Sequence, residues 1–140
     1  MALLSRKSLL AVAAVIDVAL YGRDRPVSAK ALASRHGLPA RHLEPVLQAL
    51  VRMGILKGIR GPRGGYELAR DRKRITADEI LRAAGTIEDD ADGDLVGSEL
   101  LNQVVLPAMT QAEKSFAAAL GRISLEELVR KAEPLREGEA

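Results

Sequence analysis

Hydrophobic positions near the start of the chain recur at the spacing of an amphipathic helix. We predict a helix from about Ser5 to Tyr21, rich in alanine and leucine and ended by Gly22 and Pro26. Its buried face is expected to contain Leu9, Val12, Ala13, Ile16 and Leu20.

Two shorter helical patterns follow, and a glycine separates them. Ser28 is a plausible N-cap for a helix that runs to about Ser34, and Gly37 is a typical C-terminal stop. The next helix is predicted from about Ala40 to Met53. Its apolar side is expected to contain Leu43, Val46, Leu47, Leu50 and Val51.

Pro45 is an awkward residue within this third pattern. It has no N–H, and its ring meets the carbonyl of Arg41 in a regular helix. We therefore expect the helix to begin late, at about Arg41, or to bend slightly.

The next segment reads as a β-hairpin with a basic tip. Residues 55–59 and 66–69 alternate as two strands, and we expect these strands to cover the helices with Ile55, Ile59, Tyr66 and Leu68. Between them, Gly61, Gly64 and Gly65 can take the positive φ angles of a tight reversal. The order of helix, turn, helix and hairpin is that of a winged helix-turn-helix.

Two capping boxes mark helices in the second half of the chain. Thr76 with Glu79 begins a helix that should end near Gly85, and Ser124 with Glu127 begins one that should end near Lys131. Isoleucine and leucine residues are placed to act as hydrophobic staples on both. The fold class expected is mainly α with a small β-hairpin.

Between these helices lie an acidic connector and an apolar seam. Residues 86–97 carry acidic side chains and few apolar ones, which is typical of an exposed connector. The following helix repeats apolar residues in steps of four and three, as in a helix that packs on another helix. The predicted dimer contacts are Val105, Met109, Ala112, Phe116, Ala119 and Leu120.

These patterns divide the chain into a winged helix-turn-helix domain at 1–85, a connector at 86–97, dimerisation helices at 98–132 and a fraying tail at 133–140. The domain before Gly85 is expected to complete its own core. The seam helix then has little to pack on except its copy in a second subunit.

Charge and composition narrow the functional classes. The net charge of +2 hides a basic stretch at 52–74 that precedes an acidic cluster at 88–94, so a polyanion is a suitable partner for the middle of the chain. The chain contains no cysteine, which excludes disulfides and thiolate-ligated metals. We expect no cofactor, no metal and no enzymatic activity, because no nucleophile, paired acid and base or phosphate loop has a recognisable spacing.

Residues 6–20 resemble the start of a secretory signal, but Asp17 interrupts the apolar run and no cleavage region follows. The run is also too short to span a bilayer. A cytoplasmic protein without membrane contact is expected.

Two elements are candidates for contact with duplex DNA. In the 40–53 helix, Arg41 could bind a guanine, Glu44 a cytosine amine, and His42 a base or a phosphate. At the hairpin tip, Arg60 and Arg63 suit phosphates or a narrow minor groove. The alternative is that these side chains form the solvated face of an amphipathic helix and a mobile loop tip.

The residues also resemble a known family. Leu4-Ser5, Pro26-Val27, His42-Leu43-Glu44, the run from Arg60 to Ala69 and the run from Ile123 to Val129 are similar to those of the IscR-type winged-helix regulators of bacteria. That family includes an iron-sulfur cluster regulator, a nitrite-sensitive repressor and a cysteine-metabolism repressor.

The resemblance implies a homodimeric regulator, mostly repressing, that binds an inverted-repeat operator in double-stranded DNA. The positions it implies for DNA contact are Ser5, Lys7, Ser28, Pro39, Ala40, Arg41, His42, Glu44, Arg60, Gly61, Pro62, Arg63, Gly64 and Gly65.

One departure concerns the signal. Many members hold an iron-sulfur cluster through three cysteines, and the corresponding stretch at 88–106 contains none. A cysteine-free member could respond to a small molecule or a protein partner, or to no ligand. The alternative function is a dimeric protein-interaction module, or a small-molecule sensor, that has lost DNA binding.

Overall fold

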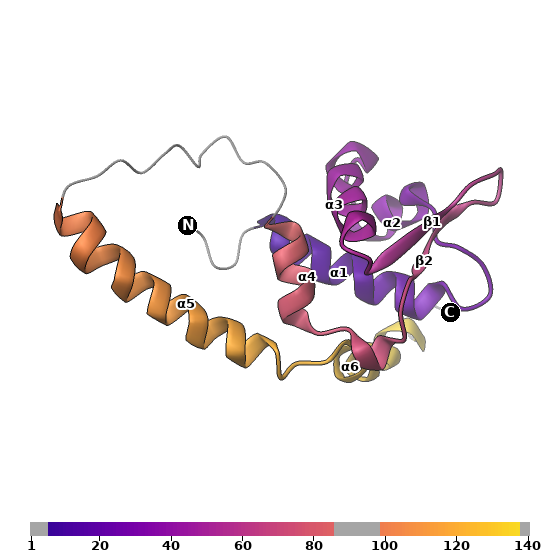
Figure 1. Cartoon of the computed structure of the whole chain (residues 1–140). Coiled ribbons are helices and arrows are strands. Elements are labelled where there is room, and N and C mark those ends of the chain that lie inside the picture. Colours follow the sequence, from indigo (N-terminus) through magenta and orange to yellow (C-terminus); the bar gives the residue numbers. More distant parts are fainter. Residues whose placement is uncertain (1–5, 86–98, 138–140) are drawn as a thin grey trace.

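Helices surround a long first helix, and one antiparallel hairpin projects from them (Figure 1). The computed structural model describes residues 6–85 and 99–137. Its elements are α1 (Arg6–Tyr21), α2 (Ala29–His36), α3 (Ala40–Arg52), β1 (Leu56–Ile59), β2 (Gly65–Leu68), the 3₁₀ turn η1 (Arg72–Arg74), α4 (Ala77–Ala84), the π-helical turn η2 (Leu101–Val105), α5 (Leu106–Leu120) and α6 (Leu125–Glu137). The predicted fold class, mainly α with a small β-hairpin, is confirmed.

Helix α1 is the centre of the packing, and its predicted buried face is only partly correct: Leu20 is buried and Val12 and Ile16 pack against the core, but Leu9 does not. It contacts α3, α4, α6 and β2, so it is covered from several sides. The fully buried positions include Ala11, Ala14 and Val15, whereas Leu9 is 55% exposed. A helix that is apolar almost all round has no clear face in the sequence, and its small alanines lie where neighbouring helices approach most closely.

The turn between α2 and α3 follows the predicted local chemistry. The Ser28 hydroxyl accepts a hydrogen bond from the Ala31 N–H at 3.0 Å, and Gly37 ends α2 with a left-handed φ of 63°. Helix α3 begins at Ala40 and runs through Pro45, so the late start is not observed. Both Pro45 and Arg41 are exposed, and the Arg41 carbonyl receives no hydrogen bond from position 45 because proline has no N–H.

The hairpin is held to the body of the domain by a second backbone pairing. Val27 and Tyr66 exchange hydrogen bonds, from the Val27 N–H to the Tyr66 carbonyl at 3.0 Å and from the Tyr66 N–H to the Val27 carbonyl at 2.8 Å. Ile55 is buried beneath the hairpin, but Ile59 is 38% exposed and does not cover the helices as expected. Ile59 pairs with Gly65 near the projecting end, beyond the reach of the core.

Glycines allow the close approaches in this hairpin. A Cβ at Gly65 would lie 2.4 Å from the Val27 carbonyl oxygen, and a Cβ at Gly64 would lie 2.1 Å from the Ile59 carbonyl oxygen. Gly61 has a φ of 116°, a conformation that L side chains rarely adopt. The glycine-rich sequence is therefore required by sterics at the turn and where the hairpin meets Val27.

The hydroxyl contacts of both predicted capping boxes are present. The Thr76 hydroxyl accepts from the Glu79 N–H at 3.3 Å, and the Ser124 hydroxyl accepts from the Glu127 N–H at 3.1 Å. Helix α6 continues to Glu137, beyond the end predicted near Lys131, so residues 133–137 are helical.

Helix α6 completes the core of the winged domain, which the sequence analysis did not anticipate. Leu125 and Val129 are buried in the same cluster as α1, α3 and α4. The Ala77 N–H donates to the Ile123 carbonyl at 2.9 Å, and the Leu125 N–H donates to the Ile75 carbonyl at 2.8 Å. The expectation that the core closes before Gly85 is therefore wrong, because it needs a helix forty residues further along the chain.

Helix α5 begins away from the winged domain and approaches it at its C-terminal end, on the side of α4 and α6 (Figure 1), and it contacts α4. None of its side chains that the structure describes is buried. The predicted connector at 86–97, Ser5 and residues 138–140 lie outside the described residues. Within the described part of the chain, no helix has the length and apolar character needed to cross a membrane.

The contact between Gly65 and Val27 yields a test of the fold. We expect Gly65→Ala to lower the free energy of unfolding by about 1–3 kcal/mol, because the new methyl group must push the two backbones apart. The matched control is Gly58→Ala in β1, where a Cβ has no atom within 4 Å. Urea denaturation of both variants measures the difference, and equal stability would contradict the assigned packing.

Candidate nucleic-acid interface

A buried carboxylate positions the first helix of the helix-turn-helix. Asp17 on α1 is 4% exposed, and it accepts two hydrogen bonds from Arg35, from Nε at 2.8 Å and from Nη2 at 2.6 Å. The Nε2 atom of His36 lies 3.1 Å from the same carboxylate, and the Arg35 guanidinium stacks 4.0 Å from the centre of the Tyr21 ring. The C-terminal end of α2 is thereby fixed on α1, and the tight turn then fixes α3.

Helix α3 has one buried side and one exposed polar side. Leu43, Leu47 and Leu50 are completely buried. The opposite side carries a stripe at steps of three and four residues, consisting of Arg41, Glu44, Gln48 and Arg52, with His42 and Pro45 beside it. Val51, which was expected on the buried side, is 37% exposed and is a correction to the predicted face.

The charged side chains at the start of this stripe make no internal contacts. Within residues 6–85 and 99–137, the side chains of Arg41, His42 and Glu44 have no ion pair or hydrogen bond. They are available to an external partner.

The arginines of the wing, the hairpin tip formed by residues 60–65, have the same property. Arg60 and Arg63 are exposed, and no carboxylate of the described residues lies within ion-pair distance of either. Other arginines of the chain are neutralised by carboxylates: Arg23 by Glu133, Arg35 by Asp17, Arg70 by Glu79, Arg72 by Glu126 and Arg82 by Asp78. The wing therefore carries two arginines whose charge is not compensated by an ion pair with the described residues.

Not every arginine of the basic stretch at 52–74 is available to a partner. Arg70 and Arg72 belong to the basic stretch in the sequence, but Arg70 binds Glu79 at 2.5 Å and Arg72 binds Glu126 at 2.5 Å. Glu126 is on α6, so its proximity depends on the fold. These two arginines hold the domain together.

The wing and the start of α2 enclose a shallow hollow of about 430 Å³. Ser28 and Ala29 line one side, and Gly58 to Gly61 with Gly64 to Tyr66 line the other. Ser28 therefore lies beside Arg60, although its hydroxyl is already used as the cap of α2.

The other predicted positions are distributed as follows. Pro39 is exposed immediately before α3, whereas Ala40 is half-buried and packs partly against the core. Lys7 is exposed in the first turn of α1, and Ser5 lies outside the described residues. The predicted DNA-contact residues thus form two groups, one at the start of α3 and one in the wing.

Three exposed polar residues on these elements were not among the predicted contact residues. Gln48 and Arg52 continue the stripe that begins at Arg41, and both line a groove of about 400 Å³ between α3 and Tyr66 of the hairpin. Lys30 is exposed in the first turn of α2. The spacing of Gln48 and Arg52 from Arg41 was a signal that could have found them.

The predicted dimer residues on α5 are mostly uncovered. Met109 is 59% exposed and Val105 is 37% exposed; Ala112 and Ala119 are exposed as well. Phe116 and Leu120 are half-buried within the single chain. Val104 and Leu100, which were not predicted, add to the exposed apolar surface.

The sequence of the chain matches a known family of proteins over most of its length. The family model Rrf2, described as an iron-dependent transcriptional regulator, matches residues 4–131. The chain belongs to the Rrf2 family. The HTH-type regulator IscR of Xenorhabdus nematophila is 34% identical over 137 residues, which cover 94% of this chain and 82% of that protein.

Solved structures of the family have the same fold. IscR of T. potens has a TM-score of 0.72 at 31% identity, with 94% of this chain and 89% of that chain covered. CymR, the global cysteine regulator of B. subtilis, has a TM-score of 0.70 at 25% identity, with 94% and 98% covered. The family identifies the chain as a DNA-binding winged-helix regulator of transcription, as the resemblance implied, and these relatives fit the expectation that it is not an enzyme.

The described residues also bear on the family's link to iron. The chain has no cysteine, and residues 6–85 and 99–137 contain no group of three His, Asp or Glu side chains that could hold a metal ion. Thiolate ligation of a cluster is chemically excluded in this chain.

Proposed function

We propose that this Rrf2 protein is a homodimeric, sequence-specific repressor that binds a palindromic operator and contains no iron-sulfur cluster. The observation that supports this most directly is that Arg41, Glu44, Arg60 and Arg63 are exposed and have no ion pair within the described residues, on the two elements that a winged helix-turn-helix turns toward DNA. Membership of the Rrf2 family supports DNA binding. The positions of the unpaired charged side chains indicate which surface binds the DNA.

Each element has a distinct role in this proposal. The first turns of α3 enter the major groove, where the Arg41 guanidinium can donate two hydrogen bonds to a guanine and the Glu44 carboxylate can accept from a cytosine amine. The wing places Arg60 and Arg63 against phosphates or in the adjacent minor groove. Base contacts provide the sequence preference, and phosphate contacts provide most of the affinity.

Dimerisation follows from the exposed apolar side of α5. Met109 on α5 and Val105 at the end of η2, immediately before it, are large exposed apolar side chains, and a second copy of α5 is the surface that would cover both chains symmetrically. Two winged domains related by a two-fold axis read half-sites whose centres are about one helical turn apart, roughly 34 Å. A repressor of this kind acts in the cytoplasm, where bacterial DNA is located.

The proposed regulator differs from cluster-binding members in its signal. Because no cysteine is available, the protein senses something other than an iron-sulfur cluster held by thiolates. The protein is then regulated by a small-molecule effector or by a protein partner, or it represses constitutively without any ligand.

The wing generates a prediction about salt dependence. Replacing Arg60 or Arg63 by Ala should weaken binding to every DNA sequence and reduce the slope of log affinity against log salt by roughly one unit for each arginine. Fluorescence anisotropy across a salt series measures both quantities. Arg82→Ala is the matched control, because that arginine is neutralised by Asp78 on α4. An unchanged slope in the double wing variant would show that the wing does not contact the backbone of DNA.

The reading helix generates a prediction about base preference. Selection from random duplex DNA should enrich a palindrome with the native protein, and Arg41→Ala or Glu44→Ala should relax the preference at one position in each half-site, with a loss of about 1–3 kcal/mol for the preferred base. Arg82→Ala on α4, whose arginine binds Asp78 and lies on neither α3 nor the wing, should enrich the native palindrome. Failure of the native protein to enrich any sequence would favour the interaction-module alternative.

The apolar side of α5 generates a prediction about assembly. Met109→Glu places a charge in the proposed interface and should shift the protein from dimer to monomer, because a buried unpaired carboxylate is costly. Analytical ultracentrifugation measures the shift. Gln111→Glu is the control, because it is exposed two positions further on and so lies on the opposite side of the helix. Retention of a dimer by Met109→Glu would place the interface elsewhere.

A further inference from the structure

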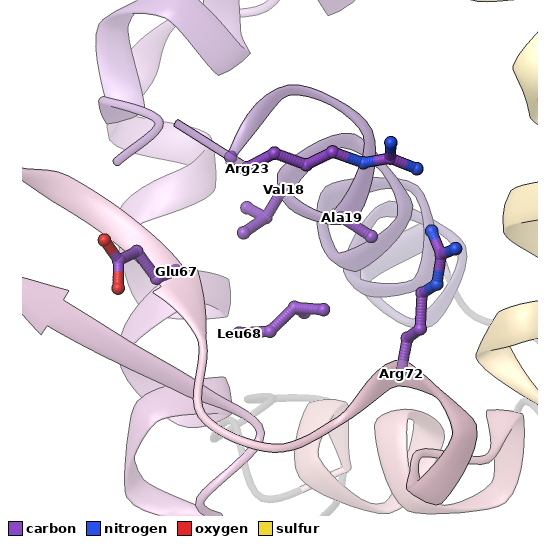
Figure 2. Close-up of a pocket in the computed structure, with 7 residues that line it drawn as sticks. Val18, Ala19, Arg23, Glu67, Leu68 and Arg72 are labelled. Atoms are coloured by element: carbon purple, nitrogen blue, oxygen red, sulfur yellow. The ribbon is translucent and has the colours of Figure 1, made fainter. Parts of the chain in front are cut away.

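A pocket away from the DNA-contacting elements lies between the end of α1, strand β2 and the turn η1. Its volume is about 300 Å³. Val18, Ala19 and Leu68 provide apolar carbon surface in its centre (Figure 2), and Gly22 adds a stretch of backbone without a side chain. The remaining lining residues are charged: Arg23, Glu67 and Arg72.

The charged residues are segregated within this pocket. The guanidinium groups of Arg23 and Arg72 lie on one side, and the Arg72 head extends toward Arg23 (Figure 2). The Glu67 carboxylate lies on the opposite side (Figure 2). Each guanidinium already has one carboxylate neighbour, Glu133 or Glu126, so the attraction for an anion comes from its remaining N–H donors beside apolar surface and not from a net positive field.

Both arginines retain unused hydrogen-bond donors. Arg23 donates from Nη2 to Glu133 of α6 at 3.1 Å, and Arg72 contacts Glu126 of α6 through Nε at 2.5 Å. A guanidinium has five N–H donors, and the remaining nitrogens of these two have no partner within residues 6–85 and 99–137. The terminal nitrogens of Arg72 are therefore available for the two-pronged contact that guanidinium groups make with a carboxylate.

The surroundings restrict the ligand to a narrow chemical class. The apolar surface of Val18, Ala19 and Leu68 favours an aliphatic body, and the volume suits a chain of a few carbons. Glu67 on the far side has its carboxylate 3.6 Å from Lys57 Nζ, and it leaves no hydrogen-bond donor there for a second carboxylate of the ligand. A single carboxylate next to the arginines with an uncharged alkyl end next to Leu68 satisfies all three conditions.

We propose that this pocket is a binding site for a short-chain aliphatic monocarboxylate, which binds the free guanidinium donors of Arg23 and Arg72. The site shares no side chain with α3 or the wing, so it stands independently of the DNA-binding proposal. Glu133 competes with the ligand for Arg23, because both are carboxylates that bind the same guanidinium.

Titration of the full-length protein with valerate, in the absence of DNA, tests the site. Isothermal titration calorimetry should show saturable binding at roughly millimolar concentration, as expected for a ligand of this size. Amide resonances of Gly22 and Leu68 should shift in the NMR spectrum. Valeramide, which lacks the charge, and glutarate, which carries a second one, should bind at least about tenfold more weakly.

Two substitutions with opposite expected effects distinguish a binding role from a structural one. Arg23→Gln should weaken valerate binding about tenfold, because it removes a charge-assisted hydrogen bond. Glu133→Gln should tighten binding severalfold, because it frees the Arg23 guanidinium, although it removes the same ion pair between α6 and the segment that follows α1. Arg82→Gln on α4 is the control and should leave the affinity unchanged.

The proposal is overturned if valerate does not saturate, if valeramide binds equally well, or if Arg23→Gln and Glu133→Gln change the affinity in the same direction. Circular dichroism confirms the fold of each variant, since Arg23 is 52% exposed and tolerates replacement. The DNA affinity of Arg23→Gln, measured in parallel without valerate, should equal that of the native protein. A failed titration with intact DNA binding therefore contradicts this site alone.

Discussion

The buried carboxylate of Asp17 is the constraint on which the arrangement of the DNA-binding elements depends. A charge that is 4% exposed is tolerated only when its oxygens are bound, and both partners, Arg35 and His36, come from the last turn of α2. The carboxylate thus selects one position of α2 on α1. Because only a tight turn around Gly37 separates α2 from α3, the orientation of α3 follows from that contact. The Arg35 guanidinium also stacks on the ring of Tyr21 in α1, and this contact further restricts its position.

The arginines of this chain serve two purposes, and their partners distinguish them. Arg70 and Arg72 bind carboxylates and join η1 to α4 and α6, so their charge is used within the fold. Arg60 and Arg63 bind none within the described residues and project on a hairpin. A net charge of +2 therefore underestimates the field at the wing, because neutralised charges elsewhere contribute little to it.

The features that could be predicted from the sequence are those that depend on neighbouring residues. The caps of α2, α4 and α6 and the glycine-rich turn follow from local backbone chemistry, and each was predicted near its observed position. The same holds for the unpaired wing arginines, because no carboxylate is near them in the sequence.

The features that could not be predicted depend on contacts between distant segments. The burial of Ala11 rather than Leu9 is set by the helices that pack around α1, and no periodicity within α1 records them. The pairing of Arg72 with Glu126 and the entry of Leu125 into the core both require α6 to return to α1. The pocket beside Arg23 arises from three separate segments, so only the folded chain brings its charges together.

The exposed state of α5 has a thermodynamic consequence for the protein. Helices of about this length are marginal in water without tertiary contacts, and within one copy α5 buries none of its described side chains. The free energy that keeps it ordered must come from whatever covers its apolar side. If that cover is a second copy, the order of the helix and the occupancy of a two-part operator both vary with the amount of protein in the cell, so that expression level itself becomes a control variable.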